Sequence, residues 1–211
     1  MEGFDIRVVM VSFLAIIISL TVHEFAHAWM ADRLGDPTPR EHGRLTLNPM
    51  VLFKAHPFGS LIVPLIGAFQ GFLIGWAATP VNPRLVRRDI TMRKAEFLIS
   101  FAGPASNMIL AVISAVLWAA CVRTLDGSLE PIVYLLQMMV FANIFLALLN
   151  LMPVPPLDGF TVLESLSPKN PIIPFVQNYS FIVLLLVFMY AGHIFRPVMR
   201  WTNSVLMWMV Q

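Results

Sequence analysis

The sequence predicts an all-α polytopic membrane protein with about four to six transmembrane helices in one integral membrane domain, residues 1–211. Hydrophobic residues make up 58% of the chain and charged residues 12%, whereas soluble domains carry about 25% charged residues. Apolar runs recur along the chain, and their lengths are close to the roughly 20 residues that a helix needs to span a bilayer. This composition excludes a disordered chain and a nucleic-acid partner, and the net charge of +2 is expected to act on membrane orientation.

Four apolar runs are predicted as full spans: residues 6–31, 97–122, 132–152 and 179–195. Residues 58–76 are apolar but short and contain Pro64 and several glycines, so they either cross the membrane or enter it and return. The alternating pattern of residues 43–49 predicts a short membrane-associated β-strand, and residues 75–80 are a second candidate strand. Residues 197–211, rich in Trp and Met, are expected at the membrane interface.

Polar side chains inside these apolar runs are the first candidates for function, because burying them in lipid is costly. Three groups stand out: His23, Glu24 and His27; Asn107 after Gly103 and Pro104; and Asn150 leading to Asp158.

The first group reads His-Glu-Phe-Ala-His over residues 23–27. Positions i and i+4 share one face of a helix, so both imidazoles can bind one zinc ion while Glu24 serves as general base. The alternative is a pair of core histidines satisfied by a buried acid. Burying an ionised glutamate in lipid costs free energy, so a glutamate at this position indicates a functional role. This favours the metal site over the alternative.

A catalytic zinc takes three protein ligands and keeps one position open. The extended pattern of soluble metalloproteases fails here, because Met30 and Arg33 occupy its Gly and His positions. Asp158 is the best candidate for the third ligand: three prolines prevent a regular helix just before it, and Gly159 permits close backbone approach. The alternative for Asp158 is a solvated residue in a loop turn.

These motifs resemble those of the site-2 protease family of intramembrane zinc metalloproteases. The resemblance is carried by residues 23–27, by Asn150 to Gly159, and by the Phe-Ala-Gly-Pro-Ala-Ser-Asn segment of residues 101–107. It implies one Zn²⁺ held by His23, His27 and Asp158, Glu24 as catalytic base, and Asn150 as a group that holds substrate or the developing oxyanion.

The segment around Gly103 and Pro104 is expected to let helices approach closely near the site. Asn107 is expected either to support a metal ligand or to join helices. Lys54 and His56 stand where short family members show His and Asp, which leaves the role of that segment open. His56 is expected to be an interfacial residue rather than a ligand.

The resemblance implies a zinc-dependent endopeptidase that cleaves transmembrane or signal-peptide segments of membrane proteins within the lipid bilayer, in regulated intramembrane proteolysis. A metal transporter and a catalytically inactive membrane scaffold of the same fold are the alternatives. The sequence does not indicate the physiological substrate, the trigger for cleavage or the oligomeric state.

Whether residues 58–76 cross the membrane decides whether the candidate ligands lie on one side of it. If residues 58–76 cross the membrane, His27 and Asp158 fall near opposite sides and Lys and Arg divide evenly. If the segment re-enters, both residues share one side, which then carries 10 Lys and Arg against 4. Because positive residues are retained inside, we expect a multi-pass cell-membrane protein whose active site opens toward the cytoplasm.

Overall fold

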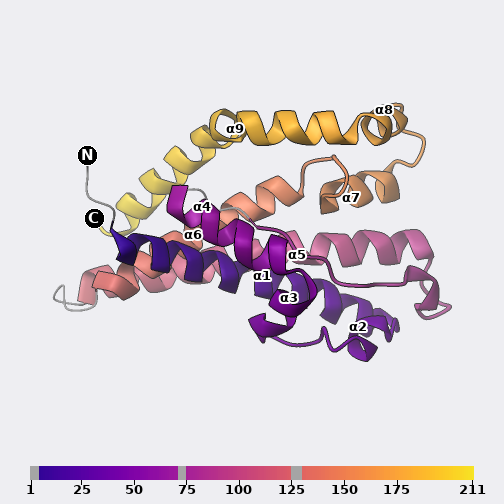
Figure 1. The fold of residues 1–211 in the computed structure, drawn as a ribbon, viewed down its shortest axis with the longest axis horizontal. Helices are drawn as coiled ribbons and strands as arrows, with labels where there is room; N and C mark the ends of the chain where they lie inside the picture. Colours follow the sequence, from indigo (N-terminus) through magenta and orange to yellow (C-terminus); the bar gives the residue numbers. More distant parts are fainter. Residues whose placement is uncertain (1–4, 71–74, 125–129) are drawn as a thin grey trace.

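The computed structural model describes residues 5–70, 75–124 and 130–211, and within these ranges the chain is helical with no β-strand. Four helices are long and apolar enough to cross a membrane: α1 (Ile6–Leu34), α5 (Met92–Thr124), α6 (Glu130–Asn150) and α9 (Ser180–Met209). They run roughly along one direction (Figure 1). The prediction of a multi-pass all-α protein is confirmed, at the lower end of the expected number of spans.

Helix α1 lies at the centre of the bundle and packs against both α5 and α6, which also pack on each other. Half of its most apolar stretch is buried, compared with 11% of the corresponding stretch of α9. Ile16 of α1 meets Ala142 and Leu146 of α6 in one buried cluster. Helix α1 ends at Gly35, whose φ of 103° is a left-handed conformation that glycine adopts without strain.

The short apolar segment begins with one turn of π-helix, η1 (Phe58–Ile62), and continues as α4 (Val63–Gln70). Beyond the undescribed residues 71–74, the Trp76 amide donates to the Gly59 carbonyl at 2.9 Å. The two ends of this segment therefore lie side by side. Gly59 permits the approach, because a Cβ there would collide with the Trp76 backbone.

The polar connection after α1 contains two short helices, α2 (Thr38–Glu41) and α3 (Pro49–Ala55). Between them, residues 43–48 form turns and bends rather than the expected strand. The local reason is that the Arg44 amide bonds back to Pro39, while the Asn48 side chain caps α3 by accepting from the Met50 amide.

Residues 75–87, here called the strap, lie beside the end of α1 and contain the short 3₁₀ turn η2 (Pro83–Leu85). The buried Asp36 carboxylate accepts from the Asn82 amide at 2.6 Å. The Arg87 amide donates to the Leu34 carbonyl at 2.9 Å. These bonds fix the strap against the polar end of α1.

After α6 the chain turns through a non-helical loop, residues 151–157, into α7 (Asp158–Leu166) and α8 (Ile172–Asn178). The loop closes tightly: a Cβ on Gly159 would collide with the Leu151 carbonyl. Helix α7 packs on α5. The prediction of an irregular segment before Asp158 is confirmed.

Helix α9 continues through Pro197 to Met209, so residues 197–211 are not a separate interfacial tail. Leu206 is buried against Trp118 of α5 and Val140 of α6, and this packing explains why the helix persists beyond the proline.

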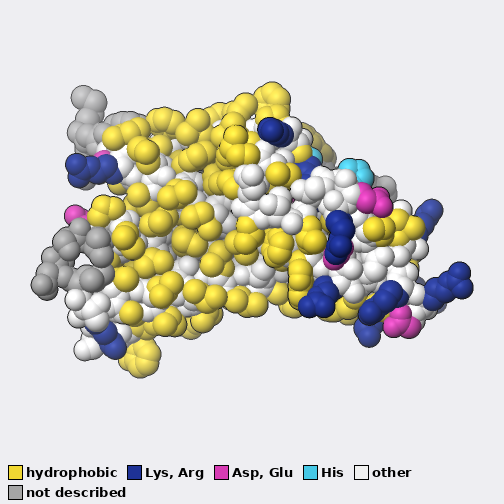
Figure 2. Space-filling model, turned by 90° about the horizontal axis from the view of Figure 1, so that it is seen from below, with side chains coloured by type: hydrophobic (Ala, Val, Ile, Leu, Met, Phe, Trp, Pro, Cys, Tyr) yellow, Lys and Arg dark blue, Asp and Glu magenta, His cyan; other side chains and the backbone are white. Residues whose placement is uncertain are grey.

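Figure 2 shows how side chains are distributed on one face. Hydrophobic side chains cover most of it, and Lys and Arg gather toward the end that carries α2 and the start of α5 in Figure 1. Fewer Lys and Arg lie at the opposite end, so the pattern fits a lipid-facing belt between two charged ends, one of them more basic.

Candidate metal centre and active site

Three side chains that the sequence places far apart converge on one point. Nε2 of His23 and Nε2 of His27 lie 3.0 Å apart. Oδ2 of Asp158 lies 3.2 Å from the first nitrogen and 3.3 Å from the second. The structure therefore brings together all three residues that the sequence predicts as ligands, two from α1 and one from the start of α7.

The second nitrogen of each ring has a fixed acceptor. Nδ1 of His23 donates to Oδ1 of Asn107 at 2.6 Å, and Nδ1 of His27 donates to the Ile99 carbonyl at 2.7 Å. Because both partners accept, each neutral ring carries its proton on Nδ1. Both Nε2 atoms then present lone pairs to the Asp158 oxygen, the arrangement by which proteins orient histidines toward a metal.

This arrangement fits a divalent metal. In a tetrahedral zinc site with bonds of about 2.0 Å, ligand atoms are about 3.3 Å apart, close to the three distances found here. Oδ2 of Asp158 is buried and has no hydrogen bond of acceptable geometry among the described residues. Three converging lone pairs repel one another unless a cation lies between them.

A buried amide network supports the first histidine. The Asn107 amide nitrogen donates to Oδ1 of Asn143 at 2.7 Å and to the Ser19 carbonyl at 3.2 Å. Asn143 in turn donates to the Ser19 hydroxyl at 2.8 Å. Asn107 thus both supports a candidate ligand and joins helices, the two roles between which the sequence did not decide.

Gly103 lies directly against the imidazoles. A Cβ on it would be 2.6 Å from Cε1 of His23 and would collide with Nε2 of His27. Pro104, fully buried beside it, cannot donate to the preceding turn and so weakens α5 locally. The predicted close approach of helices occurs here, against the candidate ligands themselves.

The three candidate ligands line a cavity of about 190 Å³, and Glu24 lines it as well. Oε2 of Glu24 accepts from the Thr79 hydroxyl at 2.8 Å. Asn150, at the end of α6, also lines the cavity, and its amide nitrogen donates to the Leu146 carbonyl. The remaining walls include Leu20, Trp76, Leu149, Leu157 and Phe188.

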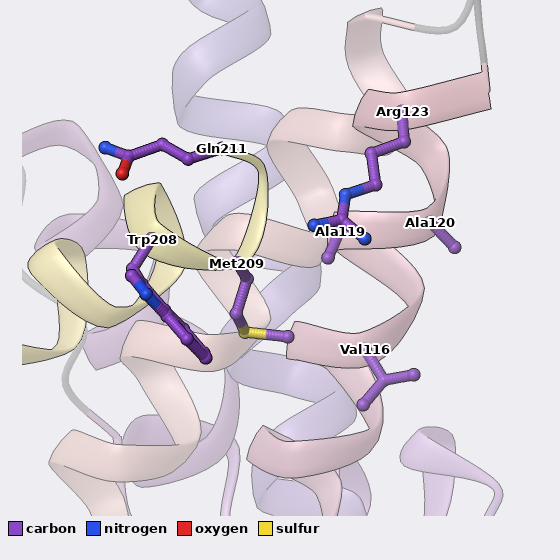
Figure 3. Close-up of a pocket in the computed structure, with 7 residues that line it drawn as sticks. All are labelled: Val116, Ala119, Ala120, Arg123, Trp208, Met209 and Gln211. Carbon is purple, nitrogen blue, oxygen red and sulfur yellow. The ribbon is translucent and has the colours of Figure 1, made fainter.

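A larger cavity, about 620 Å³, lies between the ends of α5 and α9 (Figure 3). Arg123 is its one charged lining residue, and the other side chains include Trp208, Met209 and Gln211. It contains no group of metal-binding or nucleophilic side chains, so the smaller cavity is the candidate site.

Three contributors to the site were missed by the sequence analysis. Asn143 is a polar residue in an apolar span, so the rule that identified Asn107 could also have identified it. The Ile99 carbonyl and Thr79 carry no such signal, because a backbone acceptor and a loop threonine have no distinctive pattern.

Four membrane-length helices, together with two buried histidines and a half-buried aspartate that can hold a metal, define the class: a polytopic membrane metalloprotein. Residues 11–191 match the sequence model of Peptidase family M50. The chain therefore belongs to this family, the site-2 proteases, and is a zinc metalloprotease, a hydrolase with zinc as its cofactor.

The names of individual relatives agree with this family assignment. The chain is 36% identical over 182 residues to "Putative zinc metalloprotease YwhC" of Bacillus subtilis, which covers 83% of this chain and 78% of the relative. It is 32% and 35% identical to the proteins named Rip2 of Mycobacterium tuberculosis and Mycolicibacterium smegmatis, covering 82% and 81% of this chain. The matched region spans 64% of each Rip2 chain. No solved structure matches.

Replacing Asn107 with alanine is expected to weaken zinc binding about 10–100-fold, the usual effect of losing the partner that orients a ligating histidine. Titration of the purified protein with a competing zinc chelator measures this. The control is Asn203→Ala, on the exposed surface of α9. Equal zinc affinity in the Asn107 variant and the wild type would contradict the role of the amide.

Replacing Gly103 with alanine is expected to displace the His27 ring and to weaken zinc binding at least about tenfold. Gly192→Ala is the matched control, because a Cβ there meets nothing within 4 Å. Zinc affinity, by competition with a chelator, and melting temperature are measured for both variants. Wild-type zinc affinity in the Gly103 variant would show that the rings lie farther from α5 than the structure places them.

Proposed function

We propose that this chain is an intramembrane endopeptidase that cleaves transmembrane or signal-peptide segments of membrane proteins, in regulated intramembrane proteolysis, and that residues 1–211 form a single integral membrane protease domain. The observation that carries the proposal is the convergence of three lone pairs, from His23, His27 and Asp158, beside Glu24. These three side chains would hold one zinc ion.

Zinc bound there would polarise the scissile carbonyl and lower the pKa of a coordinated water to about 7. Glu24 takes a proton from the attacking water and returns it to the leaving amine. Asn150 lines the same cavity and is placed to donate to substrate or to the developing oxyanion if its bond to Leu146 is exchanged.

The contact between the two ends of residues 58–76 supports an orientation in the membrane. The bond from Trp76 to Gly59 supports a re-entrant segment over residues 58–76, since a chain that crossed fully would separate these residues. Four crossings then remain, and one side carries 10 Lys and Arg against 4. We place that side, and the opening of the active site, in the cytoplasm of a cell-membrane protein.

The cavity wall suggests how substrate binds. A helical substrate segment must unwind before its peptide bond can be attacked, and the unwound strand needs partners for its amides. Residues 75–79 of the strap form no helix and line the cavity. They can pair with such a strand by β-addition.

Metal transport gains no support. A transport path needs metal-binding groups at successive depths, whereas the described residues contain one group of His, Cys, Asp or Glu side chains close enough to hold a metal.

The decisive variants are Glu24→Gln and Asp158→Ala, assayed in detergent against a panel of single-span substrates. The wild type is expected to cleave at least one of them. Glu24→Gln should keep zinc but slow cleavage about 10²–10⁴-fold, the usual contribution of a general base. Asp158→Ala should lose zinc.

Glu164→Gln, an exposed residue of α7, is the control for the first change, and exposed Asp89→Ala for the second. Wild-type cleavage by Glu24→Gln would remove Glu24 as the base. Full zinc retention by Asp158→Ala would remove Asp158 as a ligand.

A further inference from the structure

The Thr79 side chain contacts the glutamate of the candidate site. Its hydroxyl oxygen lies 2.8 Å from Oε2 of Glu24 and 3.2 Å from the Glu24 carbonyl. A hydroxyl has one proton to donate, and a bond to a carboxylate is stronger than one to a neutral carbonyl. The shorter contact is therefore the principal hydrogen bond.

We infer that Thr79 is a positioning residue for Glu24, and that His56 holds Thr79 in place. This inference rests on the proposed peptide hydrolysis, because it concerns how the base of that reaction is oriented. It assigns a role to a loop threonine and to a histidine expected at the interface.

The segment that carries Thr79 is fixed on both sides. On one side, Nε2 of His56 donates to the Ala78 carbonyl at 2.9 Å, in the residue just before Thr79. On the other, the Asn82 amide donates to the buried Asp36 carboxylate at 2.6 Å. The hydroxyl is thus presented to Glu24 by a backbone that is anchored within three residues in each direction.

The two carboxylate oxygens of Glu24 have different roles in this arrangement. Oε2 is held by Thr79, which leaves Oε1 for the attacking water. Glu24 is 4% exposed, and a carboxylate held in one rotamer loses less entropy on reaching the reactive geometry. Thr79 also lines the cavity, so the wall that would receive substrate and the base that would act on it are joined by one hydrogen bond.

The test compares Thr79→Val, which keeps the shape and removes the donor, with Thr79→Ser, which keeps the donor. We expect kcat of Thr79→Val to fall about 10–100-fold, less than the full contribution of a general base, with KM within about twofold. Thr79→Ser is expected to retain most of the wild-type kcat. Zinc content and melting temperature should match the wild type in both variants.

Thr202→Val is the matched control. Thr202 is buried in α9, and its hydroxyl has no partner among the described residues, so this variant should leave kcat unchanged. The inference is overturned if Thr79→Val keeps the wild-type kcat, if it changes only KM, if it loses zinc, or if Thr79→Ser is as slow as Thr79→Val.

The role of His56 in holding Thr79 in place is tested in the same assay. His56→Ala should lower kcat several-fold, and His56→Gln, whose amide nitrogen can replace Nε2 as donor to Ala78, should restore it. Failure of the glutamine to rescue would overturn the role of His56.

The outcomes separate this inference from the proposed function. Cleavage by the wild type and none by Glu24→Gln supports the function whatever Thr79 does. A zinc-loaded wild type that cleaves no substrate overturns both, because there is then no reaction for Thr79 to assist.

Discussion

Three lone pairs held about 3 Å apart in a buried cluster are the constraint on which the rest of this structure depends. Two belong to imidazoles of α1 and the third to the carboxylate of Asp158. Such a cluster is unfavourable until a cation occupies its centre, and a bound cation makes the same geometry strongly favourable. The tight loop before α7 and the packing of α7 on α5 serve to bring the third oxygen to that centre.

The polar interior of the bundle is arranged around the same point. The chain of bonds from His23 through Asn107 to Asn143 and Ser19 joins α1, α5 and α6. In lipid, where apolar packing between helices gains little from exclusion of water, interhelical hydrogen bonds and close approach at small residues hold helices together. One set of contacts therefore both orients a candidate ligand and joins the three inner helices.

The parts of the site that sequence reasoning could predict are those encoded locally or by a strong pattern. The i, i+4 spacing places His23 and His27 on one helical face whatever surrounds them, and a run of prolines before Asp158 required an irregular loop. The positions of the membrane-length helices could be predicted from the lengths of the apolar runs in the sequence. Asn107 was a candidate support for a metal ligand, but its bond to Nδ1 of His23 could not be predicted, and neither could the bond from His27 to the Ile99 carbonyl. Both bonds depend on how α5 packs on α1.

The incorrect expectations have physical causes as well. Alternation over residues 43–49 predicted a strand, but a lone alternating segment has no neighbour to pair with, and local caps and turns satisfied its backbone instead. The Trp and Met content of residues 197–211 predicted a separate segment at the interface, whereas α9 continues through them and Leu206 packs against Trp118 and Val140. In both cases tertiary context outweighed the local pattern.

Zinc K-edge X-ray absorption of the purified protein tests the central claim most directly. The account predicts a four-coordinate site with two imidazole nitrogens at about 2.0–2.1 Å and oxygen ligands at about 2.0–2.2 Å. A sulfur shell, which would implicate the single cysteine Cys121, or a site with fewer than two imidazoles would contradict it.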